Sequence, residues 1–264
     1  MTLVGETRGE GVPIVLLPWF GLDRLAMAAA FEPTIEGSAC WQRVYVDLPG
    51  CGQSPAGAES SDGVVDAVCD YVDAKLGSEP FLLSGCSYGG YLAAAIARRR
   101  PDQVAGLLLV CPGIKILADD RVLPEGPSSP AAGDWLTDVP PDLHDHLSRA
   151  VGHRTGEVAS RVARALSAGG PADEEYLQRL RTTGYQLSDE DSSTVYAGPT
   201  SVLAGREDRI VGYADQFHAI DRYPDVTYVA LSAAGHYLPF EQPAAFRSLT
   251  QEWLARCSSR SAEH

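Results

Sequence analysis

Short apolar runs alternate with amphipathic stretches along the first part of the chain. Each run is bounded by turn-forming residues and is typical of a strand buried on both faces of a sheet. The runs cover residues 12–18, 43–50, 80–85 and 104–112. Helical patterns at residues 60–77 and 91–100 separate the last three runs, and the first pattern places Val64, Val68 and Val72 on one stripe. Strands that alternate with helices predict a parallel sheet with right-handed crossovers.

This alternation is interrupted from residue 113 to residue 197. The interruption contains three short amphipathic helical patterns, separated by segments rich in Pro, Gly and Ser, near residues 141–151, 157–167 and 172–181. Strand-like runs return at residues 199–205 and 226–231, and a last helical pattern covers residues 243–256. We therefore predict an α/β fold: a mostly parallel central sheet with helices on both faces, formed by residues 1–112 and 198–264. Residues 113–197 would form an inserted helical cap.

Composition excludes several classes of partner. The chain has 264 residues, of which 45% are hydrophobic, and its formal net charge is −14. This charge disfavours nucleic acid and an anionic membrane surface as partners. The first 13 residues lack the pattern of a secretory signal, and no stretch approaches the ~18–20 apolar residues that span a bilayer. Six cysteines without CxxC spacing indicate reduced thiols in a cytoplasmic protein, and the six histidines, including His144 and His146, show no metal-ligand spacing.

The turn between the run at residues 80–85 and the helix that follows carries the first chemical signal. Gly85-Cys86-Ser87-Tyr88-Gly89 matches G-x-S-x-G between a strand and a helix. Such a sharp turn forces the serine into a strained backbone conformation, and flanking side chains larger than hydrogen would collide. Strain of this kind costs ~1–3 kcal/mol, so it is rarely kept in a mere connector. The pattern predicts that Ser87 is a nucleophile.

A serine nucleophile needs a base and a group that orients the base. At neutral pH a histidine must accept the serine proton, and a carboxylate must hold the imidazole in the correct tautomer. Asp208 lies in the turn after the strand-like run at residues 199–205, and His236 lies in the loop after the run at 226–231. Both positions follow the carboxyl end of a strand, where sheets of this type place their sites. Glu207 is the alternative acid, and we favour Asp208.

Together these segments resemble the α/β-hydrolase superfamily over nearly the whole chain. The motifs LLPWFG, DLPGCGQS, GCSYGG, GREDRIV and GHYLPFEQP occur in the family's order. The resemblance implies that Ser87, Asp208 and His236 are nucleophile, acid and base, and that no cofactor or metal is required. A serine at the turn argues against dehalogenase or epoxide-hydrolase chemistry, which uses a carboxylate nucleophile.

One segment departs from the family pattern. After the first buried strand the family usually has His-Gly, whereas this chain has Pro18-Trp19. The resemblance nevertheless implies that the backbone N–H groups of Phe20 and Tyr88 form the oxyanion hole. Trp19 would be either a packing residue under the cap or a wall of the acyl pocket.

We therefore predict a serine hydrolase that cleaves a small to medium carboxylic ester, lactone or thioester through an acyl-enzyme on Ser87. Its partner would be a small-molecule substrate, held in a mainly apolar pocket lined by Trp19, Trp135, Leu136, Leu143, Tyr176, Tyr185 and Tyr237. The acidic residues of the cap leave open an aminopeptidase of the proline-iminopeptidase kind. The altered oxyanion loop leaves open a non-hydrolytic lyase, cyclase or ligand receptor.

Overall fold

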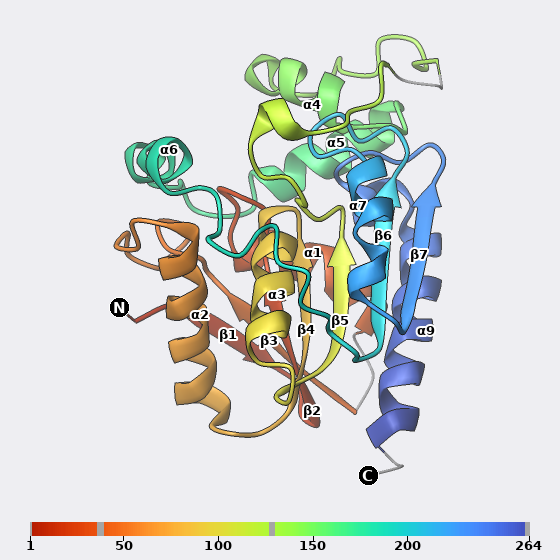
Figure 1. The fold of residues 1–264 in the computed structure, drawn as a ribbon. Helices are drawn as coiled ribbons and strands as arrows, with labels where there is room; N and C mark the ends of the chain where they lie inside the picture. The colour runs from red at the N-terminus through yellow and green to blue at the C-terminus, as the bar shows by residue number, and fades with distance from the viewer. Residues whose placement is uncertain (1, 36–39, 127–129, 262–264) are drawn as a thin grey trace.

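The computed structural model describes residues 2–35, 40–126 and 130–261. Within these residues, seven strands form one sheet in the order β1-β3-β2-β4-β5-β6-β7 (Figure 1). The strands are β1 (Gly5–Arg8), β2 (Val12–Leu17), β3 (Trp41–Val46), β4 (Phe81–Cys86), β5 (Val104–Val110), β6 (Thr200–Gly205) and β7 (Val226–Leu231). All neighbours run parallel except β1, which pairs antiparallel with β3 at the edge. The predicted fold class, an α/β fold with a mostly parallel sheet, is confirmed.

Helices cover both faces of the sheet. Helices α1 (Arg24–Ile35) and α9 (Pro243–Ser261) pack together on one face, and α2 (Ser61–Leu76) and α3 (Tyr88–Arg99) pack together on the other. Successive strand residues point to opposite faces. Along β2, Ile14 and Leu16 accordingly join the core under α1 and α9, whereas Val15 and Leu17 join the core under α2 and α3. The strands that the sequence predicts as apolar runs are therefore buried on both faces of the sheet.

Several of the described elements lie outside the pattern read from the sequence. Strand β1 has the sequence GETR, which carries no apolar run, and helix α1 buries residues on most of its circumference rather than on one stripe. Helix α7 (Ala214–His218) and the short 3-10 helix η3 (Ile220–Arg222) connect β6 to β7. None of these elements changes the order of the parallel strands.

The helical part of the segment between β5 and β6 lies over the carboxyl ends of the strands, and the last part of the segment runs back beside α3 to the start of β6 (Figure 1). It contains the 3-10 helices η1 (Ala118–Asp120) and η2 (Pro141–Leu143), and the helices α4 (His144–Ala150), α5 (Gly156–Leu166) and α6 (Glu174–Thr183). These three α-helices correspond to the three amphipathic patterns of the interruption. The division of residues 113–197 from the core as a cap stays a prediction.

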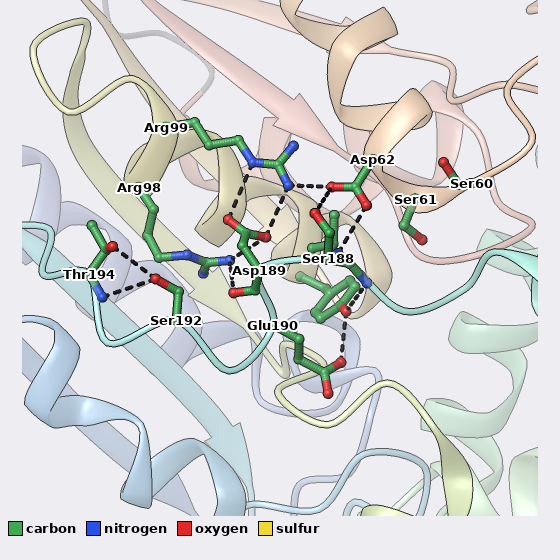
Figure 2. Close-up of polar contacts among 12 residues, drawn as sticks. Ser60, Ser61, Asp62, Arg98, Arg99, Ser188, Asp189, Glu190, Ser192 and Thr194 are labelled. Carbon is green, nitrogen blue, oxygen red and sulfur yellow. Dashed lines mark hydrogen bonds and ion pairs between the residues drawn. The ribbon is translucent and has the colours of Figure 1, made fainter.

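Ion pairs and hydrogen bonds fasten the end of this segment to the core (Figure 2). Asp189 accepts from Arg98 and Arg99, at the end of α3, at 3.2 and 3.0 Å. The Asp62 carboxylate of α2 accepts from Arg99 and from the Ser188 amide and hydroxyl. Each exposed ion pair contributes little alone, but the shared partners make the contacts one network. The network fixes where the chain leaves the helical segment and returns to β6.

A buried carboxylate joins the helical segment to the loop after β7. Glu241, at the end of α8 (Leu238–Glu241), is 2% exposed, and burial raises its pKa to about 7 against the opposing effect of four N–H donors. The donors are the amides of Gly152, His153, Gly235 and Tyr237, at 2.7–3.1 Å. Two donors belong to the segment after α4 and two flank His236. The Glu241 side chain therefore links the segment after α4 to the loop that carries His236.

Replacement of Glu241 by glutamine should lower the free energy of unfolding by about 1–3 kcal/mol. The amide nitrogen of glutamine would face at least one N–H donor and leave it buried without an acceptor. Thermal unfolding at about pH 8 measures the change. The matched control is Glu175→Gln, whose side chain is 88% exposed and pairs only with Arg179 on the surface, where such pairs contribute under ~0.5 kcal/mol. Equal melting temperatures for the two variants would contradict this role for Glu241.

Candidate active site

Ser87 occupies a turn that only glycine neighbours permit. The residue joins β4 to α3 with a φ of 54° and a ψ of −116°, a conformation that costs energy for any side chain other than hydrogen. A Cβ on Gly85 would overlap the backbone of Gly89, and a Cβ on Gly89 would overlap the carbonyl oxygen of Leu17. The Ser87 amide donates to the Val110 carbonyl at 3.0 Å, which ties the turn to β5. The two glycines are therefore required by close backbone approach.

His236 is held on one side by Asp208. The His236 Nδ1 atom lies 2.8 Å from the Asp208 Oδ2 atom, and both side chains are buried. The other oxygen of Asp208 accepts from the amides of Ile210 and Val211, at 2.8 and 3.0 Å, so the carboxylate cannot rotate away. Asp208 makes this contact, and the neighbouring Glu207, the alternative acid, has its amide bonded to the Ala234 carbonyl.

One cleft of about 560 Å³ is lined by both Ser87 and His236. Of the pocket residues predicted from the sequence, Trp19, Tyr185 and Tyr237 also line this cleft. The others do not: Trp135, Leu136, Leu143 and Tyr176 lie elsewhere. Trp135 and Leu136 belong to a core cluster that also contains residues of α4 and α5, and Leu143 packs against that cluster. The Tyr176 ring occupies the space beside Gly50, where a Cβ would overlap it.

The amide N–H groups of Phe20 and Tyr88 have no hydrogen-bond acceptor among the described residues. Phe20 lines the cleft, and Tyr88 is the first residue of α3, directly after Ser87. Their rings meet edge to face with centroids 5.2 Å apart. An N–H at the first turn of a helix is an available donor for an anion. These two amides are therefore available as donors, and their role as an oxyanion hole beside Ser87 stays a prediction.

Trp19, which stands where the family usually has glycine, contacts the histidine loop. It is 2% exposed, and its indole N–H donates to the His236 carbonyl oxygen at 3.3 Å. Its ring also lies against Tyr237 and Phe240, with centroids 5.8 and 6.1 Å apart. Trp19 is therefore both a packing residue and part of the cleft wall.

His146 lies in the cleft and was not predicted there. Its Nε2 atom lies 2.8 Å from the Tyr237 hydroxyl. Burial, followed by the charges of His236 and Arg149, lowers the pKa of His146 to about 4, so the ring is neutral at physiological pH. The sequence showed His146 only as one half of a His-x-His pair. Such a pair indicates a metal site where its spacing fits one, but it does not indicate whether either ring lines a cleft.

Four arginines line the same cleft: Arg121, Arg149, Arg181 and Arg209. They are single residues far apart in an acidic chain, and no spacing marks them as a group. Within the described part of the chain, no three His, Cys, Asp or Glu side chains gather closely enough to hold a metal ion. In the same residues, every helix is too short or too polar to cross a lipid bilayer.

Comparison with known proteins agrees with this geometry. A profile of the alpha/beta hydrolase family matches residues 14–249. The chain is 34% identical over 111 residues to a pimeloyl-[acyl-carrier protein] methyl ester esterase from Neisseria meningitidis, covering 42% of this chain but only 34% of that protein. It is 26% identical to the protein of the same name from Aeromonas hydrophila, over 96% of this chain and 100% of that one.

The solved structures include a similar fold over the whole chain. An alpha/beta superfamily hydrolase from Oenococcus oeni has a TM-score of 0.88 and 26% identity, with 97% of each chain covered. The profile match includes the turn at Ser87, the Asp208 loop and the His236 loop, which the structure brings to one end of the sheet. The chain belongs to the alpha/beta hydrolase family.

Proposed function

We propose that this protein is a serine hydrolase that cleaves small to medium carboxylic esters through an acyl-enzyme on Ser87. The observation that carries the proposal is the cleft that Ser87 and His236 share, with Asp208 behind the imidazole. The Nδ1–H of His236 donates to Asp208, so Nε2 is the nitrogen left to accept a proton.

The reaction then follows from these positions. The Ser87 hydroxyl attacks the ester carbonyl while His236 Nε2 accepts its proton, and Asp208 stabilises the imidazolium that forms. The tetrahedral oxyanion would accept hydrogen bonds from the Phe20 and Tyr88 amides, which have no other described acceptor. The imidazolium returns its proton to the departing alcohol, and water resolves the acyl-enzyme by the same steps. None of these steps requires a metal or cofactor.

The relatives support an ester over the other acyl compounds. Those from Neisseria meningitidis and Aeromonas hydrophila are both named as methyl ester esterases. Lactones and thioesters react through the same attack on a carbonyl and remain within reach of the same residues. The carboxylic ester is therefore the first substrate class to test.

The cleft disfavours an aminopeptidase. Such an enzyme must neutralise a substrate amine, and among the described residues no aspartate or glutamate lines the cleft beside Ser87. The non-hydrolytic alternative depends on an oxyanion loop altered by Pro18 and Trp19. The Phe20 amide has no described acceptor, which supports hydrolysis, because a backbone donor does not depend on the side chains that precede it.

Replacement of Ser87 by alanine should lower kcat for p-nitrophenyl butyrate by on the order of 10⁶, because no other group replaces the nucleophile. Thermal unfolding should change little, since alanine fits the same turn. Ser248→Ala, at an exposed position of α9, is the matched control and should retain wild-type activity. A fluorophosphonate probe should label the wild type and the control but not the Ser87 variant. Near wild-type turnover by Ser87→Ala would refute the assignment of the nucleophile.

Replacement of Asp208 by asparagine should lower kcat by about 10⁴, because the amide favours the wrong imidazole tautomer. Glu207→Gln should change kcat less than about twofold, since His236 Nδ1 contacts Asp208. Ester turnover by both purified variants gives the comparison. The reverse order of effects would show that Glu207 orients the base.

A further inference from the structure

The cleft beside Ser87 carries four positive charges and no negative one among its described lining residues. Arg121, Arg149, Arg181 and Arg209 line it, and arginine keeps its charge at every physiological pH. The whole chain has 35 acidic against 21 basic residues, so composition predicts the opposite balance. The four come from separate segments: the stretch after η1, helix α4, helix α6, and the turn after β6. Their meeting at the nucleophile is a property of the fold.

Within the described residues, none of these four arginines forms an ion pair. Arg121 donates to the carbonyls of Lys115, Ile116 and Ile210, and Arg209 donates to the carbonyl of Ser148. A carbonyl satisfies a donor but carries no net charge, so it leaves the charge of the guanidinium uncompensated. Elsewhere in the molecule arginines do pair with carboxylates, as Arg99 does with Asp62 and Asp189.

Two of the arginines are placed to touch a bound molecule. Arg149 is exposed, and its side chain makes no hydrogen bond or ion pair to a described residue. Arg181 is also exposed, and its guanidinium lies over the Phe20 ring, 4.4 Å from the centroid. The Phe20 amide is one of the two proposed oxyanion donors. Arg181 is therefore close to where the ester carbonyl would bind, while Arg149 lies on the side of His146.

We infer that the cleft selects esters that carry an anionic group, a carboxylate or a phosphate, on their acyl or their alcohol part. This inference rests on the proposed hydrolase function and names the substrate class. Arginine binds both anions through paired N–H donors, and the guanidinium gives up its water more readily than an ammonium does. A neutral ester would leave four like charges facing each other across the cleft without a counter-charge.

The test compares esters that differ only in charge. Mono-p-nitrophenyl adipate has a carboxylate at the end of the acyl chain, p-nitrophenyl hexanoate has the same number of acyl carbons and no charge, and the hexanoate of a carboxylated p-nitrophenol has the charge on the leaving group. The wild type should give a kcat/KM at least about tenfold higher for one of the anionic esters than for the neutral one. Which anionic ester is preferred tells whether the anion belongs to the acyl or the alcohol part.

The variants Arg149→Gln and Arg181→Gln should each reduce this preference by about tenfold, the change expected for one charge-assisted hydrogen bond. Arg164→Gln is the matched control, because Arg164 is an exposed arginine of α5 outside the cleft lining, and its preference should equal that of the wild type. Raising the salt concentration from about 0.05 to 0.5 M should also reduce the preference of the wild type. Equal kcat/KM values for charged and neutral esters, or a preference unchanged in both variants, would overturn the inference.

A binding measurement separates this inference from the proposed function. Calorimetry with the Ser87→Ala variant gives the affinity for monomethyl adipate and for methyl hexanoate without any reaction. Tighter binding of the anionic ester supports the inference even if the wild type hydrolyses no ester and takes up no fluorophosphonate, a result that would refute the hydrolase proposal alone. Turnover of neutral esters with equal binding of both ligands would leave the hydrolase proposal standing and refute the anionic substrate.

Discussion

The backbone contact at the turn that carries Ser87 is the constraint on which the site depends. Gly85 and Gly89 approach one another, and Gly89 also approaches the Leu17 carbonyl at the end of β2, so closely that neither has room for a Cβ. This contact fixes the start of α3 relative to two adjacent strands. It also sets the strained conformation of Ser87 and places the Tyr88 amide at the first turn of α3. The proposed nucleophile and one proposed oxyanion donor are thus positioned by the same backbone contact.

His236, the proposed base, is positioned differently, by contacts to segments that are distant in the sequence. The His236 amide donates to the Ala150 carbonyl at 2.6 Å, its carbonyl accepts from Trp19, and its ring is held by Asp208. Glu241 binds the amides on either side of it together with two amides after α4. The histidine loop is therefore attached to the helical segment as well as to the Asp208 turn after β6. A change in the packing of α4 would move His236, the proposed base. Ser87 would stay in place, because its turn is held by the sheet, so the distance between the two side chains would change.

Sequence reasoning succeeded where local rules act and failed where packing decides. The parallel strands, the turn at Ser87 and the loops of Asp208 and His236 each have a local signature, and the structure contains all of them. Strand β1 has the sequence GETR and is a strand because it pairs with β3, whereas α1 is apolar around most of its circumference. Neither element therefore shows a hydrophobic period. The sequence pattern does not show whether Trp135 and Tyr176 line a pocket or pack in a core, because an aromatic side chain in an amphipathic segment can do both. The four arginines of the cleft could not be predicted as a group, because they are far apart in the sequence and only the folded chain brings them together.

The distribution of charge has a consequence for how a substrate would bind. The chain as a whole is strongly acidic, while the cleft beside Ser87 is lined by four arginines. At physiological salt the field of a charge is screened within ~8 Å, so an approaching anion meets the acidic surface first and the arginines only near the cleft. Long-range steering would therefore contribute little to the association rate of an anionic ester. The four charges act instead at short range, where water is partly excluded and an arginine contact strengthens. Selection for an anion would then appear mainly in how long the substrate stays bound.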